Sequence, residues 1–373
     1  MRVLALVSDA YGGRGGIALY NRNLLKALCD HPEVDEVSAI PRTITYGLEE
    51  LPRKLNYVTS AAGSKFRYLF ACVRIAFSRQ RPDLIFCCHL HLLPFAYLLK
   101  IVFKCPVIPV LYGVEAWTPT SRWAVNYLCR KLTGFISIRK LTARRFIDWA
   151  GLSHVNYFYL PNCIDESKYG IAPKRPDLLE RYGINGKTVI MTVGRLDTAE
   201  IDRNKGFDEV LEVLPELRKQ VSNLVYIIMG DGDDRERMIK KAEGLGVGDM
   251  VVFTGYVRDV EKADHYRLAD AFAMPGSNKI FDRYPYRFVF LEALACGVPV
   301  VGCRLEDESE ANDPDAKKLI IQVDPNNKEE ITQGILNALS LPKQLNPELS
   351  NFYYASFSKT LRHIVDKLVH PTR

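Results

Sequence analysis

Short apolar runs alternate with amphipathic stretches along the whole chain of 373 residues. Apolar runs of this kind are typical of buried strands, and the stretches between them are typical of helices that cross back over a parallel sheet. The alternation therefore predicts an α/β protein. In the first half, the predicted strands are Arg2–Val7, Leu84–Cys87, Pro106–Val110 and Gly134–Ile138.

A second series with the same rhythm begins near Lys187, after the polar, proline-containing stretch Asp165–Lys187. Because a domain usually has roughly 100 to 200 residues, two Rossmann-like domains are expected. We place them at residues 1–168, joined by a C-terminal helix over 350–373, and at residues 169–349. The predicted strands of the second series are Thr188–Val193, Leu224–Met229, Met250–Thr254, Ala271–Pro275, Val298–Val301 and Leu319–Val323, and its helices are Phe207–Leu217, Arg235–Ala242 and Phe288–Ala295.

The composition fits a globular protein, with 47% hydrophobic and 25% charged residues. The net charge of +6 is a mild excess that suits an anionic nucleotide or a membrane surface, and it does not indicate a nucleic-acid partner. The nine cysteines show no paired C-x-x-C spacing, and we see no secretory leader, so we expect reduced thiols and a cytoplasmic location. No apolar run approaches the roughly 20 residues of a membrane helix.

A glycine-rich turn, Tyr11–Gly16, follows the first predicted strand and opens a helix. Backbone amides and the positive end of a helix can bind a phosphate at such a turn. Gly13, Gly15 and Ala18 also fit the G-x-G-x-x-A dinucleotide pattern, but the second strand, Val37–Ile40, is not followed by the acidic residue that this pattern requires. A tight connection without a ligand is the alternative.

Two cations flank a loop at the start of the second series. Arg195 follows the strand Thr188–Val193, and Lys205 precedes the helix that begins at Phe207. Both therefore lie at the carboxyl edge of the predicted sheet, where open α/β folds bind ligands. A guanidinium and an ammonium at this edge suit a diphosphate, although they could also be ordinary solvated charges.

Further along, Asp231, Asp233 and Asp234 follow the strand Leu224–Met229. The D-x-D spacing could hold a divalent metal. We favour turn geometry and helix capping, because Gly and Asp are preferred where a strand turns into a helix.

The most specific segments are Ala269–Ser277 and Phe288–Gly302. Together with other segments, they resemble the retaining GT-B glycosyltransferases of the large family 4 group, and the likeness covers nearly the whole chain. The other segments are Val193-Gly194-Arg195, Lys205-Gly206, Phe253–Val257 and Leu160–Asp165. The resemblance implies a GT-B fold, in which two Rossmann-like domains face each other across an interdomain cleft.

The resemblance also implies a set of donor-binding residues. Arg195 and Lys205 would hold the diphosphate of a nucleotide-sugar donor, and the amides of Phe288 and Val289 would add to phosphate binding. Glu292 would bind the ribose hydroxyls, unless it is an ordinary surface residue of its helix. Tyr256 and Val257 would flank the base, while Gly15 and Gly16 would close over the phosphate from the first domain.

The chain departs from the family pattern at three places. Tyr284 stands where the family has a second acidic residue, eight positions before Glu292, and Asp282 is the nearest carboxylate that could replace it. Tyr112 stands where a histidine is expected; it can hydrogen-bond a sugar but cannot exchange a proton as imidazole does. The acidic loop Glu306–Glu308 replaces expected glycines. His89 and His91 could face the cleft instead, or be structural.

We therefore expect a metal-independent enzyme that needs no cofactor besides its donor substrate. It would transfer a sugar with retention to a polysaccharide, glycolipid or lipid-linked acceptor, with Arg195, Lys205, Asp282 and Tyr112 as catalytic candidates. The alternatives are a nucleotide-sugar-binding protein that has lost catalysis and a GT-B-shaped epimerase. The basic, aromatic stretches Lys65–Arg81 and Leu92–Phe103 suit peripheral membrane contact, although helices packed on a sheet have the same pattern.

Overall fold

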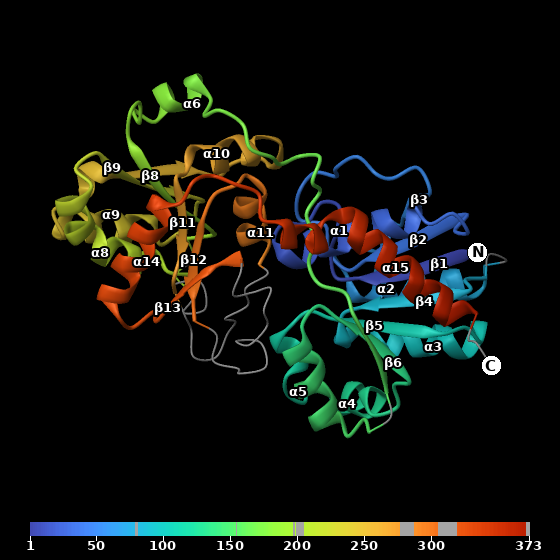
Figure 1. The fold of residues 1–373 in the computed structure, drawn as a ribbon. Helices are drawn as coiled ribbons and strands as arrows, with labels where there is room; N and C mark the ends of the chain where they lie inside the picture. Colours follow the sequence, from blue (N-terminus) through green and yellow to red (C-terminus); the bar gives the residue numbers. More distant parts are fainter. Residues whose placement is uncertain are drawn as a thin grey trace. The chain divides into compact units, whose positions relative to one another are not determined.

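The computed structural model describes residues 1–78, 81–153, 155–196, 198, 205–276, 287–304 and 319–370. The chain forms two compact units (Figure 1). The N-terminal unit contains Met1–Cys163 and the C-terminal segment from Phe352 onward, and the C-terminal unit contains Ile164–Asn351.

The N-terminal unit is built on a seven-stranded parallel sheet with the order β3-β2-β1-β4-β5-β6-β7. Leu6 of β1 lies opposite Ile40 of β2 on one side and Cys87 of β4 on the other. The strand order therefore reverses between β1 and β4, as in Rossmann folds. The strands are β1 (Arg2–Val7), β2 (Glu36–Pro41), β3 (Leu55–Tyr57), β4 (Leu84–Cys88), β5 (Val107–Leu111), β6 (Gly134–Ser137) and β7 (Asn156–Tyr159).

Alternate strand residues such as Leu4 and Leu6 form one buried core with four helices. Outside that core, the first and last helices of the unit pack against each other, with the rings of Tyr20 and Phe357 5.6 Å apart (Figure 1). The four core helices are α2 (Lys65–Ala76), α3 (Leu93–Phe103), α4 (Trp123–Cys129) and α5 (Lys140–Ala150), and the packed pair is α1 (Gly16–Cys29) and α15 (Tyr354–Val369).

The C-terminal unit has a six-stranded parallel sheet with the order β10-β9-β8-β11-β12-β13. It repeats the pattern of the first unit, and its order reverses between β8 and β11. The strands are β8 (Thr188–Val193), β9 (Leu224–Met229), β10 (Val251–Gly255), β11 (Ala271–Met274), β12 (Val300–Cys303) and β13 (Ile321–Val323).

Three helices of the C-terminal unit, α8, α9 and α14, share a buried core with its strands. The helices of this unit are α6 (Pro176–Arg181), α8 (Phe207–Gln220), α9 (Arg235–Gly244), α10 (Lys262–Leu268), α11 (Phe288–Ala295) and α14 (Lys328–Ser340). In the described part of the chain, no helix combines the length and the apolarity needed to cross a membrane.

The prediction of two series of parallel strands and helices is confirmed, and the strands Arg2–Val7, Thr188–Val193 and Leu224–Met229 match the prediction at both ends. The sequence did not predict β3 or β7. The helix predicted over Lys65–Arg81 ends earlier, at Ala76, where Phe77 leaves the helical conformation.

Candidate functional site

Three backbone segments meet where the strand order of the C-terminal unit reverses. Arg195 follows β8, Gly206 is the N-cap of α8 with a φ of 94°, and Gly276 follows β11. A Cβ atom on Gly206 would lie 2.6 Å from the amide nitrogen of Gly276, so only glycine allows this approach. Open α/β sheets bind ligands at this edge.

The structure brings the two predicted cations into one loop. The Nζ atom of Lys205 lies 3.3 Å from the backbone carbonyl oxygen of Arg195. The side chain of Lys205 also passes close to Gly194, where a Cβ atom would lie 3.0 Å from its Cδ atom. Arg195 is exposed and Lys205 is half-buried, and both lie at the carboxyl edge of the sheet.

The loop that carries Arg195 packs directly on the loop after β9. The amide of Leu196 donates to the carbonyl oxygen of Asp231 at 3.0 Å. A Cβ atom on Gly230 would lie 1.8 Å from the carbonyl oxygen of Gly194, and one on Gly232 would lie 1.8 Å from that of Leu196. The glycines around Asp231 therefore allow two backbones to touch, and this contact fixes the Arg195 loop.

The expectation that an aspartate side chain caps the following helix is wrong for Asp234. This residue is the N-cap of α9, but its side chain makes no capping hydrogen bond. Its carboxylate accepts hydrogen bonds from Arg237 instead, and Arg237 also binds Asp208 at 2.8 Å. Among the described residues, no group of three or more histidine, cysteine or acidic side chains is placed to hold a metal ion.

Glu292 lies on α11 and is 3% exposed. Its Oε1 atom accepts a hydrogen bond of 3.0 Å from the Tyr169 hydroxyl, and its Oε2 atom accepts one of 2.6 Å from the Tyr266 hydroxyl. Burial, together with the charge of Glu292, raises the pKa of both phenols, so they stay protonated donors. Each carboxylate oxygen keeps capacity for a further hydrogen bond.

A lysine balances this carboxylate. The Nζ atom of Lys262 lies 2.8 Å from Asp259. Burial acts to lower the pKa of Lys262, but the charges of Glu292 and Asp259 outweigh it, so that the pKa is raised overall. The ammonium therefore remains charged and offsets the charge of the buried Glu292 carboxylate.

The helix that carries Glu292 begins at the carboxyl edge of the sheet. Phe288 and Val289 are its first residues, and the amides of a first helical turn have no acceptor within the helix. The positive end of the helix dipole lies there. The Phe290 ring packs edge-on against Phe272 of β11, with centroids 5.8 Å apart, and fixes the start of the helix over the sheet.

The predicted base-flanking pair follows β10. Gly255 ends this strand with a φ of 70°, which turns the chain out of the sheet. Tyr256 is then 52% exposed, whereas Val257 is buried.

In the N-terminal unit, Gly15 is the N-cap of α1 and Gly16 is its first residue. Both are exposed. A Cβ atom on Gly15 would meet nothing within 4 Å, so the φ of 96° is what requires glycine there. At Gly13 the requirement is space, because a Cβ atom would lie 2.7 Å from a carboxylate oxygen of Asp9.

The structure places Tyr112 in the interior of the N-terminal unit. It is 7% exposed, and its hydroxyl donates to Oδ1 of the fully buried Asn21 at 2.5 Å. Its ring packs edge-on against Tyr20, with centroids 5.5 Å apart. Burial raises the pKa of Tyr112 well above its usual value. The Tyr112 hydroxyl thus stays protonated and donates its hydrogen bond to Asn21, within the N-terminal unit.

The two histidines after β4 form a stacked pair, with ring centroids 5.1 Å apart. The amide of His91 donates to Nδ1 of His89 at 3.2 Å. Burial, with the charges of His91 and Arg122 acting in the same direction, lowers the pKa of His89 to about 4, so its ring is neutral at pH 7.

Two of the three departures noted in the sequence lie outside the described residues: Tyr284, together with its possible replacement Asp282, and the acidic residues Glu306–Glu308. The structure therefore places Arg195, Lys205 and the start of α11 at one edge of the C-terminal sheet, and Glu292 on the same helix.

Residues 174–354 match the family described as glycosyl transferases group 1. This part of the chain belongs to the glycosyl transferases group 1. The group 1 segment contains the Arg195 loop, both of the tight glycines after β9 and the Glu292 helix. The remaining residues, including the whole N-terminal sheet, lie outside the matched range.

Two curated relatives are mannosyltransferases. The GDP-mannose-dependent alpha-(1-6)-phosphatidylinositol monomannoside mannosyltransferase of Mycolicibacterium smegmatis is 32% identical over 204 residues, which are 53% of this chain and 52% of that enzyme. The matched stretch thus spans about half of the relative's length. The GDP-mannose-dependent monoacylated alpha-(1-6)-phosphatidylinositol monomannoside mannosyltransferase of Corynebacterium glutamicum is 23% identical, over 80% of this chain and 79% of that one.

Solved structures share the fold over the full length. Anabaena HepE in complex with UDP has a TM-score of 0.74 at 17% identity and covers 99% of this chain and 100% of its own. A glycosyltransferase from Rickettsia africae has a TM-score of 0.76 at 14% identity, covering 100% and 99%. With this likeness, the two Rossmann-like units are those of a GT-B fold.

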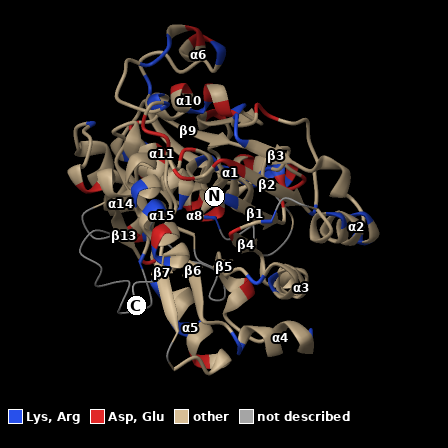
Figure 2. Cartoon of the chain, turned by 90° about the vertical axis from the view of Figure 1, so that its right-hand side faces the viewer, with Lys and Arg blue, Asp and Glu red and all other residues tan. Residues whose placement is uncertain are grey.

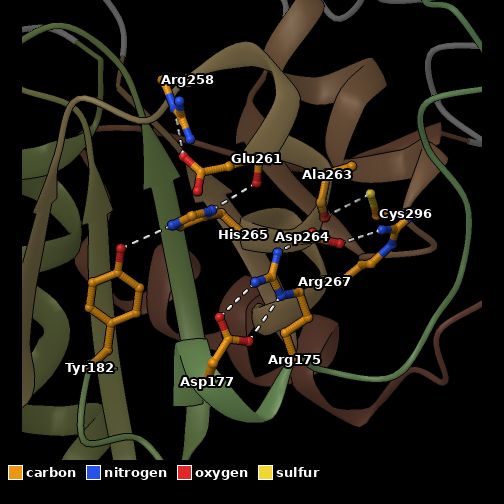
Figure 3. A network of polar contacts seen from close by, with 10 residues as sticks. All are labelled: Arg175, Asp177, Tyr182, Arg258, Glu261, Ala263, Asp264, His265, Arg267 and Cys296. Carbon is orange, nitrogen blue, oxygen red and sulfur yellow. Dashed lines mark hydrogen bonds and ion pairs between the residues drawn. The ribbon is translucent and has the colours of Figure 1, made fainter. Parts of the chain in front are cut away.

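The sequence did not indicate which residues hold the Glu292 carboxylate. Tyr169 lies just before the group 1 segment, and Tyr266 lies within it. Arg267 donates to the carbonyl oxygen of Gly170 at 2.9 Å and so holds the residue next to Tyr169. Arg267 belongs to α10, and Arg175 forms an ion pair of 2.9 Å with Asp264, which lies on α10 as well (Figure 3). Tyr169 lies in a stretch without periodicity, so no sequence pattern indicated its role.

Proposed function

We propose that this chain is a glycosyltransferase that moves a hexose from a nucleoside-diphosphate sugar to an acceptor with retention of configuration. The observation that carries the proposal is the pairing of two features in the C-terminal unit. First, Arg195 and Lys205 lie in one loop at the edge where the strand order reverses. Second, α11 starts at the same edge and carries the buried carboxylate of Glu292, which accepts hydrogen bonds from two tyrosine hydroxyls.

The donor fits these groups by charge and hydrogen bonding. Arg195 and Lys205 offset the charge of the diphosphate, as do the first amides of α11, at Phe288 and Val289. The free lone pairs of Glu292 accept from the two ribose hydroxyls, because a carboxylate matches a vicinal diol. Tyr256 and Val257 flank the base, and Gly15 and Gly16 form a second loop that closes over the phosphate.

The proposed reaction takes place on one face of the sugar. As the bond to the donor oxygen breaks, negative charge develops on the diphosphate, and Arg195 and Lys205 stabilise it. The acceptor hydroxyl attacks from the same face and gives its proton to the departing phosphate oxygen. This route needs neither a protein base nor a metal ion. Asp282 remains the candidate for an acidic contact to the sugar, and Tyr112 acts by holding Asn21 of helix α1 through its hydroxyl.

The donor to test first is GDP-mannose, because the relatives that are 32% and 23% identical are named as GDP-mannose-dependent enzymes. Their names also point to a phosphatidylinositol-based glycolipid as the acceptor class; a polysaccharide is the other acceptor to test. We place the enzyme in the cytoplasm, at the inner membrane face. All nine cysteines are buried thiols, which suits a reducing compartment.

The test has two steps. First, thermal unfolding is measured with GDP, UDP and ADP; the matching nucleotide, at about 100 times its dissociation constant, adds about 2.7 kcal/mol of stability. Second, the labelled donor sugar is followed into product. Attachment to the acceptor with retained configuration supports the proposal. Stabilisation without transfer, or an isomerised free nucleotide sugar, would favour the binding protein or the epimerase, and no stabilisation by any nucleotide overturns the donor site.

A further inference from the structure

Three helices of the N-terminal unit form one continuous layer. α3 packs against both α2 and α4. The Tyr68 ring of α2 lies edge-on to Phe95 of α3, with centroids 5.3 Å apart, and the Tyr97 hydroxyl of α3 donates to the carbonyl oxygen of Lys131 after α4 at 3.2 Å. The layer therefore presents a single outer surface, which we call the α2–α4 face.

The α2–α4 face carries large apolar side chains that the fold leaves in solvent. Phe66 is 83% exposed, Phe77 is 87%, Ile101 is 72% and Trp123 is 82%. Phe66 and Phe70 are four residues apart and therefore lie on one stripe of α2, and Phe77 follows the last residue of that helix. The inner sides of the same helices are already apolar and buried, through Tyr68, Cys72, Leu93, Ala96, Leu99, Val125 and Cys129.

A helix that is apolar on both sides normally lies in a protein core or in lipid. α3 has this character, because Lys100 is its one charged residue. Large exposed apolar side chains gathered on neighbouring helices mark an interaction site.

The charge on the α2–α4 face has one sign. Residues 62–78, 90–104 and 117–133, which contain the three helices, include eight basic residues and no aspartate or glutamate, although the whole chain has 44 acidic residues. Figure 2 shows Lys and Arg along these helices. The eight are Lys65, Arg67, Arg74, Lys100, Lys104, Arg122, Arg130 and Lys131.

We propose that the α2–α4 face docks on a membrane that contains anionic lipids. Exposed aromatic rings suit the boundary between headgroups and acyl chains, where Trp and Phe gain from burial, while lysine and arginine extend to the phosphates. A surface without acidic residues is complementary to a uniformly negative partner. The inference rests on the proposed lipid-linked acceptor, since docking would bring the N-terminal unit to the leaflet that holds such a substrate.

The experiment measures how much of the purified full chain floats with vesicles of phosphatidylcholine alone or with added phosphatidylglycerol. We expect binding to the anionic vesicles only, and weaker binding at higher salt. Arg67→Glu with Arg74→Glu should lower the partition constant by at least about fivefold for each cation. Phe66→Ser with Phe70→Ser should lower it by about tenfold or more, because two exposed rings no longer insert.

The matched controls are Val260→Ser, which changes an apolar residue that is 82% exposed in the C-terminal unit, and Arg218→Glu on α8. Both should float like the unchanged protein. Thermal stabilisation by the donor nucleotide is measured on every variant and shows that the donor site is folded; loss of that stabilisation with intact flotation would count against the proposed function alone. Equal binding to neutral vesicles, no binding, or dimers that depend on Phe66 and Phe70 would each overturn the membrane proposal.

Discussion

The hydroxyl of Tyr169 lies 3.0 Å from a carboxylate oxygen of Glu292, although 123 positions separate the two residues in the chain. Tyr169 belongs to the stretch at the start of the C-terminal unit, and Arg267 holds this stretch through the carbonyl oxygen of Gly170. The orientation of the carboxylate therefore depends on a segment that is far from α11 along the chain. Tyr169 is best regarded as a positioning residue for Glu292.

Tyr169→Phe tests this dependence. Loss of a hydrogen bond to a charged group should lower the free energy of unfolding by about 1.5–3 kcal/mol, and the affinity for the donor nucleotide should fall several-fold because Glu292 is held by Tyr266 alone. Denaturant unfolding and calorimetric titration measure the two effects. Tyr182→Phe is the matched control, since Tyr182 bonds His265 instead (Figure 3). An equal loss of nucleotide affinity in both variants would contradict the positioning role.

Arg195→Ala and Lys205→Ala test the diphosphate site. Each should reduce kcat/KM by at least about tenfold, which corresponds to about 1.4 kcal/mol of transition-state stabilisation. Arg218→Ala serves as the control, because this exposed arginine pairs with the exposed Asp249 and not with any residue of the proposed donor site. Steady-state kinetics with saturating acceptor would decide, and unchanged kcat/KM in both variants would remove these residues from the mechanism.

The alternation of apolar runs and amphipathic stretches was enough to predict both sheets, because buried parallel strands have a continuous apolar signal. It failed at β3 and β7, which end the N-terminal sheet. β3 has only three residues, and Asn156 and Tyr157 of β7 are exposed. These two edge strands are too short or too exposed to give a clear apolar pattern, whereas the edge strands β10 and β13 of the other sheet were predicted.

The loops of the candidate site could be predicted because their chemistry is local. Arg195 follows strand β8, and Gly206 directly precedes helix α8. In a parallel sheet, positions of both kinds lie at the same edge. The two residues that hold Glu292 could not be predicted. Tyr169 and Tyr266 reach its carboxylate from different elements, and each looks like an ordinary core aromatic residue in the sequence. The packing of Gly232 on Leu196 was likewise hidden, although glycines were expected in that turn.

Gly232→Ala should disturb the Arg195 loop. A Cβ atom there would lie 1.8 Å from the carbonyl oxygen of Leu196, with a φ of 154°, so the two backbones must separate. We expect a loss of about 2–4 kcal/mol in unfolding free energy and a weaker donor affinity. Gly246→Ala is the control, because Gly246 has a φ of 69° but meets nothing within 4 Å, and it should cost only about 1 kcal/mol. Equal losses would show that backbone conformation, and not the contact, requires the glycine.

The stability of the N-terminal unit should depend on the titration of His89. Burial lowers the pKa of this imidazole from 6.5 to about 4, so the unfolded chain takes up a proton at a pH where the folded chain does not. The stability that the neutral ring provides is thus complete above pH 6.5 and is lost as the pH falls to about 4, with a total of about 3 kcal/mol. His89→Asn keeps a side-chain acceptor for the His91 amide but does not titrate. In urea unfolding between pH 7 and pH 4, its stability should fall less steeply than that of the unchanged protein, by up to about 1.4 kcal/mol per pH unit; parallel curves would show that His89 takes up its proton equally in both states.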